Sequence, residues 1–225
     1  MINYINKRDS DKTILERSKV SIKIRQLAKT HKEQQKILEE IVNYAYNKNV
    51  FIWISAVLPS DLDNEYHTYL NLIKKGYTNI GLTLATYHSS VSKKIDKILL
   101  QKGHIRLVKG YYYGDIKDWN TVTNLYYLNA KKLVLSNNYH TLATHDFNIL
   151  NKLKKEYTIH FNKMELAFFY SYLDFAKINT KGFTNNKFLY ISYGNKLLYL
   201  LDNIHIVDIS RIMKRTIKNI FNKIN

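Results

Sequence analysis

The chain has 225 residues, of which 45% are hydrophobic and 13% aromatic, so it can bury one core and is not a disordered segment. Thirty-five Lys and Arg against 18 Asp and Glu give a formal charge of +17, which would attract nucleic acid or an anionic membrane. Cysteine is absent, which excludes disulfides and thiolate chemistry and fits a reducing compartment.

The positive charge is spread along the whole chain. Lys, Asn, Ile and Tyr are abundant together, as in proteins from AT-rich genomes, so compositional bias accounts for much of the charge and we expect no nucleic-acid partner. The N-terminus becomes polar before a signal segment can form, and the longest strongly apolar run, residues 51–58, is far shorter than the roughly 20 residues of a spanning helix. We expect a cytoplasmic protein, with peripheral membrane contact left open.

Apolar runs alternate with amphipathic segments along the chain. The predicted strands are residues 20–24, 50–57, 80–85, 105–108, 141–144, 157–161 and 188–192. The predicted helices are residues 31–47, 61–75, 90–102, 120–135, 147–155 and 163–175. This alternation predicts a parallel sheet. Seven strands are one fewer than a closed (β/α)8 barrel contains, and the first strand is either missing or hidden in residues 1–19.

We therefore predict an α/β fold, a TIM-like (β/α)8 barrel that is incomplete or distorted. A doubly wound open sheet would show the same alternation, but its phosphate-binding glycine fingerprint is absent. No linker is apparent, so we expect one domain over residues 1–225, with residues 1–19 as an N-terminal extension. Residues 207–225 predict a basic amphipathic helix, either packed on the core or lying on an anionic membrane.

The most informative stretch is His104–Gly110, which is followed by three tyrosines. Arg106 and Lys109 bracket two apolar residues, so in an extended chain their side chains point to opposite faces or ends, and Gly110 lets the backbone turn at once. This pattern is typical of a buried strand that ends in a site. A basic surface strand would carry the same residues.

In (β/α)8 barrels the reacting groups lie at the C-terminal ends of the strands. The polar residues predicted there are Lys23, Ser55, Thr86, Tyr87, Arg106, Lys109, Thr144, His145, Asp146 and Tyr190. Each alone has an ordinary explanation, such as a solvated strand end for Lys23 or a helix cap for His145 and Asp146. No second His or carboxylate cluster stands at ligand spacing from His145, so we expect no metal site.

Several fragments, taken in order, resemble the proline dehydrogenase family. Residues 106–110, Arg-Leu-Val-Lys-Gly before an aromatic, are similar to the family's fifth barrel strand, whose Arg lies against a flavin. Residues 143–146, Ala-Thr-His-Asp, are similar to a segment whose Thr and His hold the cofactor. Weaker matches are residues 20–23, ending in a substrate-facing Lys, residues 84–87, residues 165–170 and residues 190–194. The similarity spans about residues 20–199.

The resemblance implies an FAD-dependent enzyme that transfers a hydride from proline or a related cyclic amine or imino acid to the flavin. It also implies an electron acceptor, such as a quinone, that the sequence does not identify. The residues that it implies in catalysis are Arg106, Lys23, Tyr190 and Tyr199. Those that it implies in non-covalent FAD binding are Arg106, Val108, Lys109, Gly110, Thr144, His145 and Asp146. Fixed cations near the ring would stabilise the reduced cofactor.

The chain departs from the family pattern at three places. An Asp is missing from residues 54–57, Ala85 replaces a Gln, and Asp202 and Asn203 stand where paired arginines grip the proline carboxylate. Lys23 remains as an evident carboxylate partner. These departures leave open the hypothesis that the chain is a degenerate member of the family, a barrel that holds flavin or a partner without turnover. A nucleic-acid-binding protein is a third hypothesis, which lacks a recognisable motif.

Overall fold

The structure, a computed structural model, describes residues 19–56, 58–109, 114–169 and 173–190. The chain divides into two compact units, Met1–Leu189 and Tyr190–Asn225. Most of the second unit lies outside the described residues, as do the predicted extension at residues 1–18 and the predicted helix at residues 207–225. The single-domain organisation therefore stays a prediction.

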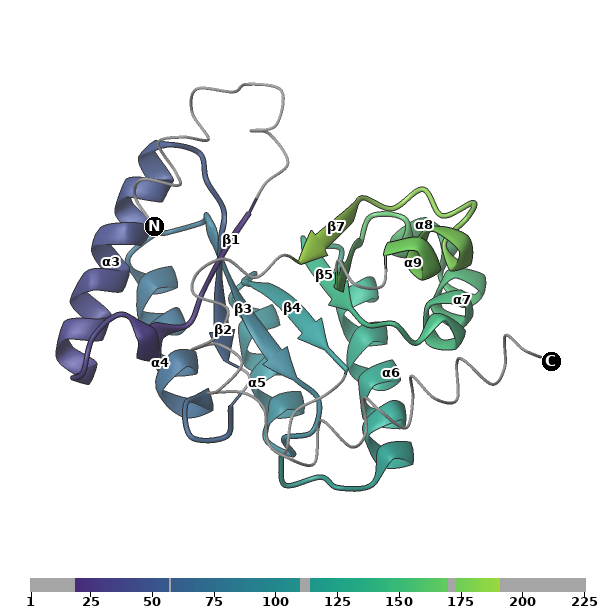
Figure 1. Ribbon diagram of the computed structural model, residues 1–225, viewed down its shortest axis with the longest axis horizontal. Coiled ribbons are helices and arrows are strands. Elements are labelled where there is room, and N and C mark those ends of the chain that lie inside the picture. The colour runs from purple at the N-terminus through teal and green to yellow at the C-terminus, as the bar shows by residue number, and fades with distance from the viewer. Residues whose placement is uncertain (1–18, 57, 110–113, 170–172, 191–225) are drawn as a thin grey trace. The chain divides into compact units, whose positions relative to one another are not determined.

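The described residues form seven strands, which alternate with helices (Figure 1). The strands are β1 (Val20–Ile22), β2 (Ile52–Ala56), β3 (Ile80–Ala85), β4 (His104–Val108), β5 (His140–Ala143), β6 (Glu165–Phe169) and β7 (Lys187–Tyr190). The helices are η1 (Ile24–Gln26), α3 (His31–Asn47), α4 (Leu62–Lys74), α5 (Val91–Leu100), α6 (Trp119–Leu135), α7 (Phe147–Glu156), α8 (Thr158–Phe161) and α9 (Leu173–Asn179).

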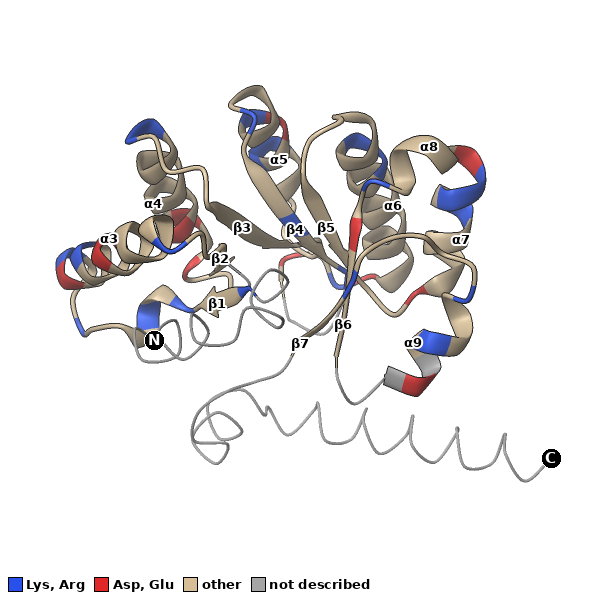
Figure 2. Ribbon diagram, turned by 90° about the horizontal axis from the view of Figure 1, so that it is seen from above, with Lys and Arg blue, Asp and Glu red and all other residues tan. Residues whose placement is uncertain are grey.

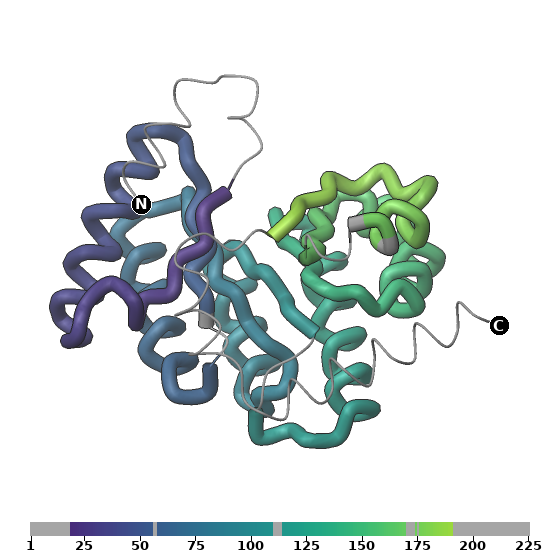
Figure 3. Tube along the Cα trace, in the orientation of Figure 1, coloured from purple at the N-terminus to yellow at the C-terminus, as the bar shows by residue number. Residues whose placement is uncertain are grey.

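The strands lie side by side in chain order from β1 to β7, and the pairs from β1 to β6 are parallel. Figure 2 shows α4, α5 and α6 in a row on one face of the sheet, and the chain trace in Figure 3 passes repeatedly from strand to helix and back. The sheet is curled, and its other face lines the interior of the incomplete barrel. The predicted fold, an incomplete TIM-like α/β barrel, is confirmed.

The core lies between the sheet and its helices. Apolar residues at alternate positions of strands β2 to β6 are fully buried, among them Ile52, Ile54, Leu82, Leu84, Ile105, Leu107, Leu142 and Leu166. Helix α3 shows the helical side of the same pattern, because Leu38, Ile41, Val42 and Ala45 recur at helical spacing and are all buried. Its start is fixed by a capping box, in which Thr30 and Glu33 satisfy each other's backbone N–H groups.

Two of the predicted elements in the last third of the chain are wrong. Residues 157–161, predicted as a strand, contain helix α8, in which Ile159 is 76% exposed and Phe161 is buried. Residues 163–175, predicted as a helix, begin with strand β6, in which Glu165 and Leu166 serve opposite faces of the sheet. Because residues on both faces of this segment are buried, it forms a strand in spite of its local preference for a helix.

No helix among the described residues is long and apolar enough to cross a membrane.

A buried histidine joins β4 to β5 at the N-terminal end of the sheet. His140 accepts a hydrogen bond at Nδ1 from the Ile105 N–H at 3.1 Å, and its Nε2 lies 2.9 Å from the Ser136 hydroxyl. Burial, and then the proximity of His104, lowers the pKa of His140 to about 3. The imidazole is therefore neutral in the folded chain throughout the neutral and mildly acidic range.

We predict that His140 makes the fold acid-sensitive. Below about pH 6.5 the side chain is protonated in the unfolded chain but not in the folded chain. The contribution of His140 to the free energy of unfolding is therefore fully present above pH 6.5 and is lost as the pH falls from 6.5 to 3. Urea unfolding should show that the wild type loses about 1–2 kcal/mol more than His140→Gln when the pH falls from 7 to 5. Equal losses in the two proteins would contradict this role.

Candidate active site

The interior face of the sheet carries three rows of residues in register. Nearest the N-terminal edge lie Ser21, Trp53, Gly81 and His104, in the middle lie Ser55, Thr83, Arg106, Thr141 and Glu165, and nearest the C-terminal edge lie Ala85, Val108, Ala143 and Ala167. The middle row holds the charged groups. The last row holds small side chains, at the edge where (β/α)8 barrels carry out chemistry.

Arg106 is held inside the sheet by three other strands. Its Nε donates a hydrogen bond to the Thr83 hydroxyl at 2.9 Å, and its terminal nitrogen donates to the Ser21 hydroxyl at 2.8 Å. The guanidinium carbon lies 5.3 Å from the centre of the Trp53 ring, within range of a cation–π interaction. The residue is only 9% exposed. Its charge is thus fixed within the interior.

Trp53 reaches this position because the neighbouring strand has a glycine in register with it. A Cβ on Gly81 would lie 2.2 Å from the indole ring, closer than any real Cβ contact. The ring therefore passes over the backbone of β3 toward β4. A larger residue at Gly81 would displace the indole from Arg106.

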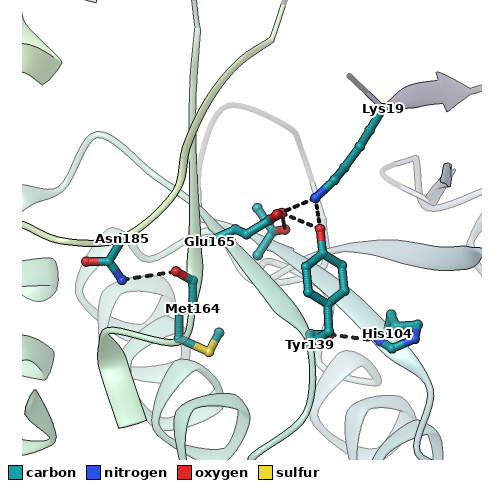
Figure 4. Close-up of polar contacts among 7 residues, drawn as sticks. Lys19, His104, Tyr139, Met164, Glu165 and Asn185 are labelled. Atoms are coloured by element: carbon teal, nitrogen blue, oxygen red, sulfur yellow. Dashed lines mark hydrogen bonds and ion pairs between the residues drawn. The ribbon is translucent and has the colours of Figure 1, made fainter. Parts of the chain in front are cut away.

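A second charged group, formed by Lys19 and Glu165, lies close enough to Arg106 for the two cations to repel each other. Figure 4 shows the polar contacts of this group. The Lys19 ammonium donates to the Glu165 carboxylate and to the Tyr139 hydroxyl, which itself donates to Glu165. Thr141 adds a hydrogen bond to the same carboxylate at 3.0 Å. The ion pair therefore links the segment that begins β1 to β6 across the interior.

Aromatic rings surround the Lys19 ammonium. Its nitrogen lies 4.2 Å from the ring centre of Phe188, 4.5 Å from that of Tyr139 and 5.8 Å from that of Phe51. Burial lowers the pKa of Lys19, and the nearby Arg106 charge adds to this, while the hydrogen bond and charge of Glu165 oppose it. The cluster is a largely buried ion pair, and removing one partner of such a pair costs much stability.

The C-terminal ends of β4 and β5 carry a separate polar group. Lys109, which is 3% exposed, forms an ion pair with Asp146 and lies 4.7 Å from the ring centre of Trp119. Asp146 caps helix α7 by accepting a hydrogen bond from the Ile149 N–H at 3.3 Å. Lys109 thus contacts the residues that begin α6 and α7, whereas Arg106 contacts β1 and β3, as the predicted opposite orientation requires.

Thr144 and His145 shape the connection from β5 to α7. The Thr144 hydroxyl accepts from the Asp146 N–H at 3.0 Å, and His145 Nε2 accepts from the Phe169 N–H at 3.2 Å. The His145 ring also stacks on that of Phe169, with 5.7 Å between centres. Both residues lie at the predicted edge, in contacts that fix the backbone there.

The remaining predicted residues are more dispersed. Lys23 follows β1 and is half-buried, Val108 lies in the row of small interior residues, and Tyr190 is the last residue of β7. Gly110 and Tyr199 lie outside the described residues. The structure therefore brings together Arg106 and Val108 on the interior, and Lys109, Thr144, His145 and Asp146 at the edge. Their contacts with a cofactor stay predictions.

A buried carboxyl lies near Lys23. Glu65, in the first turn of α4, is 1% exposed. Burial, and then repulsion from Asp61, raises its pKa to about 9, although the Lys23 charge acts in the opposite direction. Glu65 is consequently neutral at pH 7.

Sequence reasoning missed the interior residues that surround Arg106. Ser21, Trp53 and Thr83 were not singled out, although strand alternation places all three on the face that carries Arg106. Lys19 stands before the first predicted strand, and Glu165 was noted only within a weak family match. No three His, Cys, Asp or Glu side chains in the described ranges are grouped to hold a metal ion.

The comparisons with known proteins agree with this architecture. No protein-family model and no curated protein sequence matches the chain. Among solved structures, proline utilization A (PutA) from Bdellovibrio bacteriovorus, inactivated by N-propargylglycine, matches 86% of this chain with a TM-score of 0.68 and 17% identity. A PutA variant from Bradyrhizobium japonicum matches 82% with a TM-score of 0.60 and 15% identity.

At these identities the likeness shows a shared fold. The chain spans about a quarter of those proteins, 26% of the first and 24% of the second. The resemblance to the proline dehydrogenase family that the sequence suggested is thereby confirmed at the level of the fold. Function is a separate inference.

We predict that the Lys19–Glu165 pair is needed for stability. Lys19→Met should lower the free energy of unfolding by about 3–5 kcal/mol, because it leaves a buried carboxylate without its cation, and adding Glu165→Gln should restore part of the loss. Urea denaturation measures both. Lys132→Met, which breaks the exposed pair with Asp96, is the control and should cost less than about 1 kcal/mol. Equal losses for Lys19→Met and Lys132→Met would contradict the prediction.

Proposed function

We propose that this chain is an FAD-dependent oxidoreductase of the proline dehydrogenase type, which oxidises proline or a related cyclic amine. The observation that carries the proposal is the position of Arg106. It is a buried, oriented cation on the strand whose sequence resembles the family's flavin-contacting strand, next to an interior row of small side chains. The fold shared with PutA supports the same function.

The described residues fit a flat cofactor in two respects. Ala85, Val108, Ala143 and Ala167 place no large side chain along the interior row next to the C-terminal edge, and the last three remain partly exposed. Arg106, in the next row, supplies a fixed positive charge. When bound, FAD accepts the hydride from the carbon beside the amine nitrogen. The residues proposed to hold it are Arg106, Val108, Lys109, Gly110, Thr144, His145 and Asp146.

The chain's own groups would act mainly through electrostatics. Arg106 would stabilise negative charge that develops on the cofactor, and little reorganisation is required because Thr83 and Ser21 already hold the guanidinium. Lys109 has three donors, of which one serves Asp146, so the ammonium has donors left to offer a phosphate. Lys23, which follows β1, would bind the substrate carboxylate.

A barrel that holds flavin or a partner without turnover is the second candidate. The observation in its favour is the sequence Asp202-Asn203 at the position of the family's arginine pair. In the first reading an acceptor such as a quinone would reoxidise the flavin, and peripheral membrane contact would bring the two together. The barrel without turnover would need neither an electron acceptor nor contact with a membrane.

We predict that the purified protein binds FAD. It should show the absorption spectrum of an oxidised flavoprotein, and Arg106→Met should weaken retention or reduction of the flavin because it removes the interior charge. Arg25→Met, at an exposed position of η1, is the matched control and should behave like the wild type. A colourless protein that takes up no added FAD would rule out the flavoenzyme.

We also predict that free L-proline is a poor substrate. Losing a charged hydrogen-bonding partner in a buried site costs about 2–5 kcal/mol, and Asp202 would add repulsion toward a carboxylate. At about 1.4 kcal/mol per decade, this is roughly 30-fold to several thousand-fold in affinity. Anaerobic flavin reduction should therefore favour pyrrolidine or a prolyl amide over proline. Saturation by proline below the millimolar range would show that another cation replaces the arginine pair.

A further inference from the structure

Trp119 presents a large aromatic ring to solvent near the C-terminal edge of the sheet. It is 56% exposed, more than any other aromatic side chain among the described residues. It is the first residue of helix α6, which follows β4, so it lies at the edge where the cofactor is proposed to bind. An indole in this position leaves a flat apolar surface in water, which the ring of a ligand can cover.

The indole is held in place by its own backbone and by a cation. The Asp118 carboxylate accepts hydrogen bonds from the N–H and the hydroxyl of Thr121, each at 2.7 Å, so the start of α6 is fixed. The Trp119 carbonyl accepts from the Thr123 hydroxyl at 2.8 Å. The Lys109 ammonium lies over the ring, 4.7 Å from its centre. Because this cation covers one face, the exposed area lies on the other face and the ring edges.

Lys109 ties the indole to the ends of β4 and β5. Its N–H donates to the Ala143 carbonyl at 3.2 Å, and its ammonium forms an ion pair with Asp146 at the start of α7. The cation–π interaction gains strength because Lys109 is buried away from water. The ring of Trp119 is therefore oriented at the sheet edge before any ligand binds, which lowers the entropy that a stacked ligand must lose.

The order of these groups follows the order of the parts of FAD. Arg106 and Val108 line the interior, where the flavin ring is proposed to lie, and Lys109 comes next, where a phosphate is proposed to bind. Trp119 lies beyond Lys109, on the side of the helices. FAD carries its isoalloxazine, diphosphate and adenosine in the same sequence. A purine stacks on an indole through its flat face, without needing a hydrogen-bonding partner.

We propose that Trp119 is the stacking platform for the adenine of FAD, and that it makes the site selective for FAD over FMN, which ends at a single phosphate. This role rests on the proposed function, which supplies the flavin, but the adenosine half can be tested without flavin. A purely structural role, in which the indole shields the pair of Lys109 and Asp146 from water, would affect the binding of FAD and FMN alike.

The first measurement compares the dissociation constants of FAD and FMN. Trp119→Leu should weaken FAD binding by roughly 5-fold to 100-fold, as typical base–aromatic stacking predicts, and should leave FMN binding unchanged. Trp119→Phe keeps a flat ring and should recover most of the FAD affinity. Tyr46→Leu, which removes an exposed ring of helix α3, is the control and should bind both flavins like the wild type.

The second measurement uses ADP and the flavin-free protein. The chain contains two tryptophans, of which Trp53 is buried and Trp119 is exposed. ADP should quench the Trp119 fluorescence of the wild type. It should cause no quenching in Trp119→Leu, in which Trp53 is the remaining tryptophan. Ribose 5-phosphate, which lacks the base, should quench neither protein.

The outcomes are distinct. Equal losses of FAD and FMN affinity in Trp119→Leu, or an unchanged FAD affinity, would overturn the stacking role. A protein that takes up no flavin would refute the proposed function. In that case, ADP quenching that disappears in Trp119→Leu would still support an adenine site at Trp119, and a wild type that ADP does not quench would remove that site as well.

Discussion

The interior of this incomplete barrel depends on the ion pair between Lys19 and Glu165. In a closed barrel, hydrogen bonds between the first and last strands complete the ring. Here a side chain reaches across instead, from the residue before β1 to the start of β6, with the Tyr139 hydroxyl and the Phe188 ring as further partners. Removing the two charges from water costs free energy, but the ion pair, once formed, holds its two side chains in a defined geometry. It therefore fixes where the short strand β1 lies, and with it the next residues on that face.

From this constraint the electrostatics of the interior follow. Lys19 and Glu165 balance each other, and Arg106 donates to the hydroxyls of Thr83 and Ser21 and lies near the Trp53 ring. Lys109 and Asp146 form a second balanced pair at the edge of the sheet. An anionic or electron-rich ligand beside Ala143 and Ala167 would lie next to the row that holds the Arg106 guanidinium. A fixed cation of this kind would suit the stabilisation of a reduced cofactor.

The sequence predicted what local patterns control. Parallel alternation and the bounds of α3 follow from periodicity over short stretches. The opposite directions of the Arg106 and Lys109 side chains follow from strand alternation, whereas the burial of the strand was left open by the residue pattern. The failures have a different origin. Residues 157–161 have the composition of a strand, yet they form a helical turn because only Phe161 is buried, and Glu165 enters the interior because Lys19, 146 residues away, pairs with it. Contacts at such separation leave no periodic signature, so the sequence did not indicate the pair. Ser21, Trp53 and Thr83 could have been found, because strand alternation places them on the face that carries Arg106.

The central claim is that Arg106 faces a flavin bound at the C-terminal side of the interior. A crystal structure of the chain loaded with FAD tests it most directly. The account predicts the isoalloxazine ring against the row formed by Ala85, Val108, Ala143 and Ala167, with the Arg106 guanidinium in contact with the ring and still bonded to Thr83. Flavin bound elsewhere on the chain, or an Arg106 beyond hydrogen-bonding distance of the ring, would contradict it.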